Sequence, residues 1–138
     1  MARALLIAGN SIEDKAVSEW AFHIIEEKAK CDISDYNLIS PTLCHGYAGV
    51  LSVFTRTLCD CESIYIKNQI VHLKNKIEMQ FAPSSKYGFP DVEIRSKDGR
   101  QILTKTDTNK FLIGASGVIL ALLSTFHNDS LLDSHLLI

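Results

Sequence analysis

The sequence predicts an all-α protein whose helices alternate between an outer and an inner layer, with a small irregular or hairpin insertion near residues 82–109. Two observations support this. Amphipathic stretches alternate along the chain with stretches that are nearly free of charge. The two charge-poor stretches also share one pattern, Gly-x-small-Gly-Val-aliphatic, at Gly46–Leu51 and at Gly114–Ile119. Such alternation and repetition indicate two concentric layers of helices, as in a helical toroid or solenoid.

The composition is that of one ordinary globular domain. The chain has 138 residues, of which 46% are hydrophobic and 22% charged, enough for a real core. A net charge of -2 with scattered basic residues argues against a nucleic-acid partner and against binding to an acidic membrane surface. No signal peptide is evident, so a cytoplasmic location is expected. In a reducing cytosol the cysteines should be free or metal-bound thiols rather than disulfides.

Two helices are expected at the beginning of the chain. Met1–Ala8 has no N-cap residue and precedes Gly9-Asn10, a good helix stop, so it is interpreted as the tail of a helix that begins before this chain does. Ser11 would cap the next helix, with Asp14 completing an approximate capping box. That helix should run to about Lys30 as an amphipathic outer helix, with these apolar residues near helical spacing: Ile12, Ala16, Val17, Trp20, Ile24 and Ile25.

A loop over Cys31–Pro41 separates this helix from the first charge-poor one. The charge-poor helix should span about Tyr47–Leu58 and be buried on most sides. A second amphipathic helix is expected over Glu62–Gln80, with Ile66, Ile70, Leu73 and Ile77 on its buried face.

The stretch Phe81–Asn109 breaks the helical pattern. Val92-Glu93-Ile94 alternates and could pair with Gln101–Thr104 as a hairpin. So long an excursion is uncommon in a compact domain unless it has a function. A last helix is expected over Lys110–Phe126, again inner because Phe111–Leu123 carries no charge. The apolar residues after it, Leu131-Leu132 and Leu136-Leu137-Ile138, should pack back on the body.

Paired glycines open both charge-poor helices: Gly46 and Gly49 in the first, Gly114 and Gly117 in the second. Glycines one turn apart clear one helix face, so that a neighbouring backbone can approach and the helix can start in a tight turn. Because Gly costs about 1 kcal/mol relative to Ala inside a helix, the repeated pair indicates a packing reason.

Cys44-His45 is the most chemically distinctive pair of residues in the chain. Thiolate and imidazole are both good zinc ligands, and the pair stands at the head of an apolar helix. The alternative is a buried cysteine beside a capping histidine. Cys31, Cys59 and Cys61 are assigned no role, and the last two lack the usual Cys-x-x-Cys spacing. In a different fold, one of the three could complete an alternative site.

The motif Ser40–Val50 resembles the second zinc motif of the lanthionine synthetase C-like family, the cyclases of lantibiotic biosynthesis. Tyr87–Pro90, Phe111–Val118 and the final Leu136-Leu137-Ile138 resemble that family's C-terminal end. The resemblance implies an α/α toroid around a central zinc ion, with Cys44 and His45 as zinc ligands. It also implies thioether formation, in which cysteine thiols of a precursor peptide add to dehydroalanine or dehydrobutyrine. Zinc favours the thiolate, which is the nucleophile.

The family's third zinc ligand, a cysteine in a Trp-Cys-Tyr-Gly-like motif, has no counterpart here, and its acid/base histidine and aspartate come from earlier repeats. We assign that role to none of His23, His72, His127 or His135. Residues 1–138 are therefore expected to be a single C-terminal portion of a cyclase, inactive on its own.

The resemblance implies a dehydrated precursor peptide as partner, together with a dehydratase and transporter complex that could bring the protein to a membrane. A partial toroid would also expose inner-helix surface and favour self-association. The alternative function is a non-catalytic helical peptide-binding or interaction module without a functional metal site.

Overall fold

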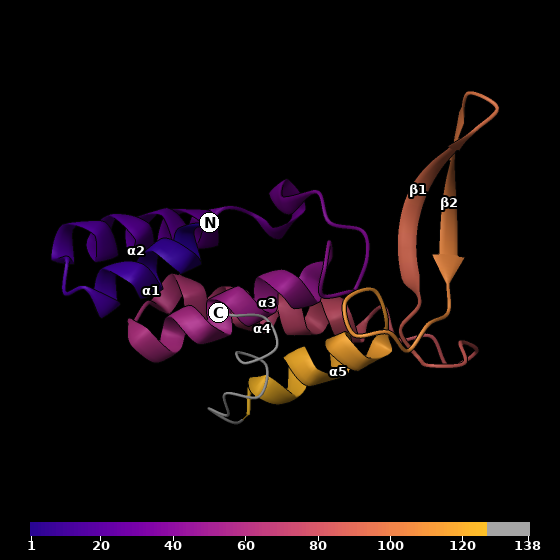
Figure 1. Cartoon of the computed structure of the whole chain (residues 1–138). Coiled ribbons are helices and arrows are strands. Elements are labelled where there is room, and N and C mark those ends of the chain that lie inside the picture. The colour runs from indigo at the N-terminus through magenta and orange to yellow at the C-terminus, as the bar shows by residue number, and fades with distance from the viewer. Residues whose placement is uncertain (127–138) are drawn as a thin grey trace.

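The structure is a computed structural model, and it describes residues 1–126, apart from the side chain of Lys97. It is mostly helical and carries one two-stranded hairpin, as predicted (Figure 1). The elements are α1 (Ala2–Ser11), α2 (Lys15–Lys30), the 3-10 helix η1 (Ile33–Tyr36), α3 (Tyr47–Asp60), α4 (Ile64–Glu78), β1 (Asp91–Lys97), β2 (Arg100–Thr106) and α5 (Ala115–Ser124). The packing predicted for Leu131-Leu132 and Leu136-Leu137-Ile138 lies outside the described residues.

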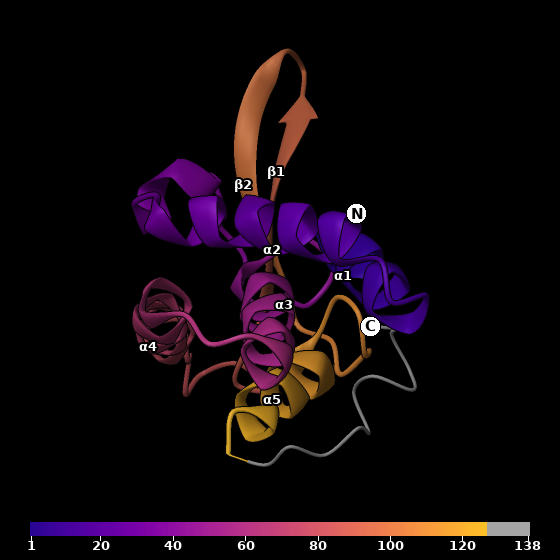
Figure 2. The same cartoon turned by 90° about the vertical axis from the view of Figure 1, so that its left-hand side faces the viewer.

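Helix α3 occupies the middle of the molecule. Seen end-on, it is surrounded by α2, α4 and α5 (Figure 2). Leu51 and Phe54 are buried on it, and so are polar residues on other sides of the helix, including Ser52 and Thr57. Complete burial of one such leucine stabilises the fold by about 1.5–3 kcal/mol. The helix that was predicted to be buried on most sides is therefore the central one.

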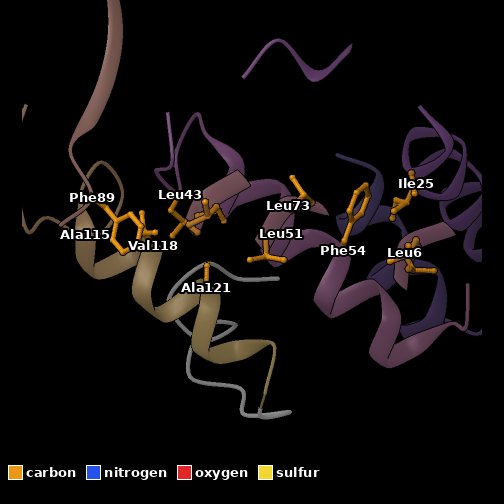
Figure 3. Packing of buried hydrophobic residues seen from close by; sticks show 14 of the residues in the cluster. Leu6, Ile25, Leu43, Leu51, Phe54, Leu73, Phe89, Ala115, Val118 and Ala121 are labelled. Atoms are coloured by element: carbon orange, nitrogen blue, oxygen red, sulfur yellow. The ribbon is translucent and has the colours of Figure 1, made fainter. Parts of the chain in front are cut away.

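The amphipathic helices α2 and α4 lie outside it. On α4, Ile66, Leu73 and Ile77 are fully buried, as the sequence predicted. On α2, Ile25 is buried as predicted, but Trp20 is 58% exposed. The buried face of α2 instead joins Ile25 to small residues, Ala21 and Ala29. Figure 3 shows Ile25 beside Leu6 and Phe54 at one end of the core.

The predicted junction between the first two helices is wrong by several residues. Gly9 does not stop α1, which continues to Ser11. A Cβ added at Gly9 would lie 2.6 Å from Ser18 Oγ, so this glycine serves the close packing of α1 on α2. The turn comes later, where Glu13 takes a left-handed φ of 57° and the amides of Glu13 and Asp14 bond back to the carbonyls of Asn10 and Gly9.

The predicted N-cap of α2 is also wrong. Ser11 Oγ donates to the Ile7 carbonyl inside α1 and caps nothing downstream. The cap is Asp14, whose carboxylate accepts from the Val17 amide at 3.1 Å. The sequence rule identified Asp14 as a capping residue but placed it three positions too far into the helix.

The last helix is shorter than predicted. Phe111–Ile113 forms a turn, and α5 begins only at Ala115. It buries Ala115, Val118 and Ala121, and Figure 3 shows these residues near Leu43 and Phe89. Ile119 and Leu123 remain 46% and 52% exposed. Burial on all sides, predicted from the absence of charge, is therefore not found for this helix.

The excursion forms the predicted hairpin. Strands β1 and β2 pair antiparallel, with Asp91 opposite Thr106 and Ile94 opposite Leu103. The two tip residues, Asp98 and Gly99, have φ values of 52° and 75°, which suits the tight two-residue turns of hairpins. The hairpin projects away from the helices (Figure 1).

Candidate metal centre

The same turn precedes both α3 and α5. The Tyr47 amide donates to the Ser40 carbonyl at 3.0 Å, and the Ala115 amide donates to the Thr108 carbonyl at 3.0 Å. Within each turn a hydroxyl oxygen accepts from a nearby amide, Thr42 N to Ser40 Oγ in the first and Lys110 N to Thr108 Oγ1 in the second. The sequence repeat is therefore also a structural repeat.

The paired glycines make these turns possible. A Cβ on Gly46 would lie 2.2 Å from the Ser40 carbonyl oxygen, and one on Gly114 would lie 2.4 Å from that of Thr108. The second glycine of each pair faces the turn in the same way: a Cβ on Gly49 would lie 2.2 Å from Leu43 O, and one on Gly117 would lie 1.9 Å from Phe111 O. Backbone atoms cannot yield to such contacts, so a side chain at any of these positions would displace the turn.

The two turns contact each other at Cys44. The Cys44 amide donates to the Leu112 carbonyl at 2.9 Å. In the alignment of the two turns Leu112 takes the place of Cys44 and Ile113 that of His45. The fold thus presents the turn twice, and only the copy before α3 carries possible metal ligands.

Cys44 and His45 are both exposed at the head of α3. They line an open cavity of about 520 Å³ whose other lining residues are mostly apolar, among them Ile24, Leu38, Val50, Val53 and Phe54. A soft sulfur and an imidazole nitrogen side by side are the donor types that zinc prefers, so these residues fit zinc.

Tyr36 and Lys28 form part of the same cavity wall. The phenol of Tyr36 donates to the Lys28 carbonyl at 2.7 Å, and the Lys28 ammonium lies 4.3 Å from the centre of the tyrosine ring. Burial raises the pKa of Tyr36 to about 12, so its phenol is neutral at physiological pH. The wall beside Cys44 and His45 therefore combines apolar surface with one cation.

Asp91, the first residue of β1, lies against the turn before α3 that carries Cys44 and His45. Its side chain is only 4% exposed, and its Oδ1 is 3.0 Å from His45 Nε2. Ser40 Oγ donates to the same oxygen at 2.8 Å, and Thr42 Oγ1 donates at 3.5 Å. Ser40 Oγ also accepts from the Val92 amide at 3.3 Å. The turn and the hairpin are joined through this carboxylate.

Among the described residues, one group could hold a metal by proximity alone: His45, Asp91 and Glu93, whose ligand atoms lie within 4.8 Å of one another. Cys44 is not a member of that group. Glu93 Oε2 is already bound by Arg95, whose Nε and Nη2 lie 2.9 and 2.8 Å away. The geometry thus offers carboxylates near His45 that the sequence motif did not include.

The sequence-based prediction of the site did not include Asp91. The signal was nearby, because Asp91 directly follows the Tyr87–Pro90 motif. Nothing local shows that this carboxylate reaches Ser40, which is 51 residues away in the chain. None of the other cysteines belongs to this ligand group, and all four cysteines of the chain are free thiols. The pKa of the Cys61 thiol is raised, mainly by burial and further by the negative charge of Asp60.

A family model described as "Lanthionine synthetase C-like protein" matches residues 1–137. The chain belongs to the lanthionine synthetase C-like family. The match includes the Cys44-His45 turn and the segments Tyr87–Pro90 and Phe111–Val118 that carry the family resemblance. No curated protein matches the chain. Within residues 1–126, no helix of this family member is both long and apolar enough to cross a membrane.

Proposed function

We propose that this chain supplies two zinc ligands, Cys44 and His45, to a lanthionine cyclase centre that closes thioether rings in lantibiotic-type peptides. The observation that carries the proposal is the placement of both donors, adjacent and exposed, at the mouth of an apolar cavity. Family membership supports it. Bound zinc would supply stabilisation of the thiolate form of the substrate cysteine.

The proposed reaction is an addition, so nothing leaves. The cysteine thiol loses its proton, its sulfur forms a bond to the β-carbon of dehydroalanine or dehydrobutyrine as the π bond between the α- and β-carbons breaks, and a proton goes to the α-carbon. The walls of the cavity, including Val50 and Phe54, would hold the apolar parts of the peptide. The acid that delivers the proton is not assigned to any described histidine, because His45 is a proposed zinc ligand and both His23 on α2 and His72 on α4 are exposed.

We further propose that the chain forms the C-terminal portion of an α/α toroid, with α3 and α5 as inner helices and α2 and α4 as outer ones. The duplicated turn and the central position of α3 support this arrangement. A third zinc ligand would come from an earlier repeat, so the chain alone is expected to bind zinc weakly and to be inactive. The partners would be a dehydrated precursor peptide and, through the family, a dehydratase and transporter complex.

A metal titration tests the proposal. Cobalt(II) bound by a thiolate gives a charge-transfer absorption, and zinc should displace it. Cys44→Ala should remove the absorption and, like His45→Ala, weaken zinc binding at least about tenfold. Cys59→Ala is the matched control, because Cys59 is also exposed but lies at the opposite end of α3. Equal zinc affinity in the wild type and Cys44→Ala would overturn the proposal.

A non-catalytic peptide-binding module is the second candidate. It is favoured by the mostly apolar cavity wall, which needs no metal to bind a peptide. This function predicts that a dehydrated precursor peptide binds equally well with and without a chelator, and equally well to Cys44→Ala. Loss of peptide binding in either case favours the metal centre.

A further inference from the structure

We propose that Asp91 is the positioning residue of His45: its carboxylate keeps the ring proton on Nε2 and leaves Nδ1 as the metal-binding nitrogen. The role toward zinc rests on the proposed function. The position of the ring proton does not, because it is a property of the metal-free chain.

The contact with Asp91 is held in place from several sides. Asp91 Oδ1 lies 3.0 Å from His45 Nε2 and receives the Ser40 hydroxyl at 2.8 Å. Burial of a carboxylate is costly unless donors surround it, and the Asp91 side chain is 4% exposed. An ionised carboxylate only accepts hydrogen bonds. The nitrogen that faces it must therefore carry the proton, and in a neutral imidazole the other nitrogen then has the free lone pair.

The rival interpretation makes Asp91 itself a metal ligand, together with His45 and Glu93. Two contacts argue against it. The Oδ1 atom nearest to His45 already accepts from Ser40 and, at longer range, from Thr42. Glu93 is engaged by both Nε and Nη2 of Arg95. A cation at this place would have to displace a guanidinium and hydroxyl donors, whereas a carboxylate behind a ligating histidine is a common arrangement.

The role also gives the excursion between α4 and α5 a function. Asp91 is the residue at which the hairpin meets the turn before α3. There Ser40 Oγ donates to the Asp91 carboxylate and accepts from the Val92 amide. The equivalent turn before α5 has Leu112 and Ile113 at the ligand positions. There the Thr108 hydroxyl, the counterpart of Ser40, accepts from the Lys110 amide. The carboxylate is thus found beside the copy of the turn that carries the ligands.

Long-range nitrogen–proton NMR of the full, metal-free chain reads the proton position directly. We expect His45 to carry its proton on Nε2. In Asp91→Asn the amide can donate instead of accept, so the Nδ1-protonated form should gain population. Zinc affinity of that variant should fall roughly 10–100-fold. Glu93→Gln is the matched control on the same strand and should change neither the proton position nor the affinity.

A wild-type His45 protonated on Nδ1 would overturn the inference whatever the zinc affinity, and this readout needs no variant that folds. Unchanged zinc affinity in a folded Asp91→Asn variant would overturn it as well. An equal loss in Glu93→Gln, with X-ray absorption showing zinc bound without sulfur, would favour the rival site. An Nε2-protonated His45 that Asp91→Asn disturbs, in a chain that binds no zinc, would support the positioning contact and overturn the proposed function instead.

Discussion

Ser40 is the residue on which the described site depends most. Its hydroxyl donates to the buried Asp91 carboxylate and accepts from two backbone amides, those of Thr42 and Val92. Its counterpart in the second turn, Thr108, accepts from the Lys110 amide, and Lys110 is exposed. Ser40 and Thr108 occupy equivalent backbone positions, but only the Ser40 hydroxyl is bonded to a buried carboxylate among the described contacts.

We expect Ser40→Ala to lower the free energy of unfolding by about 1–3 kcal/mol, because it removes a donor from a buried carboxylate. Thr108→Ala, the matched control, should cost only about 0.5–1 kcal/mol. Urea unfolding of both variants measures the difference. Equal losses would mean that the Asp91 contact adds nothing to the stability of the turn.

At the residue scale, sequence reasoning found what is local. Cys44 and His45 are neighbours in the chain, so their pairing needs no fold. Asp91 reaches the site only because the fold brings the start of β1 against the turn. Ser40 and Asp91 are 51 residues apart in the chain, and neither segment alone indicates that they meet. Trp20 shows the same limit: its spacing suits the buried stripe of α2, yet the small residues Ala21 and Ala29 face the core.

At the element scale, the sequence indicates the role of a glycine that recurs in a pattern more clearly than that of a glycine that occurs once. A pair of glycines one turn apart opens two helices, and this repetition predicts a role in close packing for Gly46, Gly49, Gly114 and Gly117. Gly9 occurs once and was interpreted as a helix stop, although it packs α1 against Ser18. A lone glycine does not distinguish between these roles. Helix α1 ends at Ser11, and the turn that follows uses Glu13, a residue with no preference for the left-handed conformation.

We expect Glu13→Gly to raise the free energy of unfolding by about 0.5–1 kcal/mol. A left-handed φ costs a side-chain-bearing residue about 1–2 kcal/mol, and the extra freedom of Gly in the unfolded chain offsets part of the gain. The control is Glu19→Gly inside α2, which should lower stability by about 1 kcal/mol. Thermal unfolding of the pair checks the sign. A loss at both positions would contradict the turn geometry.

Gly49→Ala tests the helix start itself. The new methyl would meet the Leu43 carbonyl oxygen at 2.2 Å, so we expect a loss of about 2 kcal/mol or more and a disturbed Cys44-His45 turn. Gly99→Ala at the hairpin tip meets nothing within 4 Å and strains only a φ of 75°, so it should cost about 1 kcal/mol. Comparable costs would show that the turn before α3 can yield.

At the scale of the whole molecule, the order of helices and the hairpin were predictable because each follows from periodicity or turn chemistry. The position of α3 at the centre followed from its lack of charge. The same reasoning failed for α5: a lack of charged residues does not determine whether other helices cover every side of a helix. Ile119 and Leu123 are exposed on a helix that the sequence assigned to the interior.

The outer half of the hairpin should be dispensable. In the described chain the root of the hairpin is bonded to the turn before α3, where Ser40 contacts Asp91 and Val92, and Ile94 and Ile102 further along the hairpin are exposed. Replacing residues 95–102 by an Asn-Gly turn, which joins the facing pair Ile94 and Leu103, should change the free energy of unfolding by no more than about 1 kcal/mol. Zinc affinity should not change. A larger loss in denaturant unfolding would mean that the tip stabilises the helices.

The exposed face of α5 leads to the last expectation, self-association. Ile119 and Leu123 lie one turn apart on the same face, and Phe126 beyond them is 69% exposed. Apolar residues grouped on one surface favour association, because their removal from water is stabilising. Sedimentation velocity over a range of concentrations should therefore show a wild-type chain that grows in mass with concentration.

The double variant Ile119→Lys, Leu123→Lys should remain monomeric, because it places two like charges in the contact. The matched control is Ile64→Lys, Val71→Lys on α4, where two apolar residues of similar exposure, 62% and 55%, lie on an outer helix. It should associate like the wild type. If the α4 variant also abolishes association, the contact is not specific to α5; if the wild type is monomeric throughout, this face does not bind a second copy.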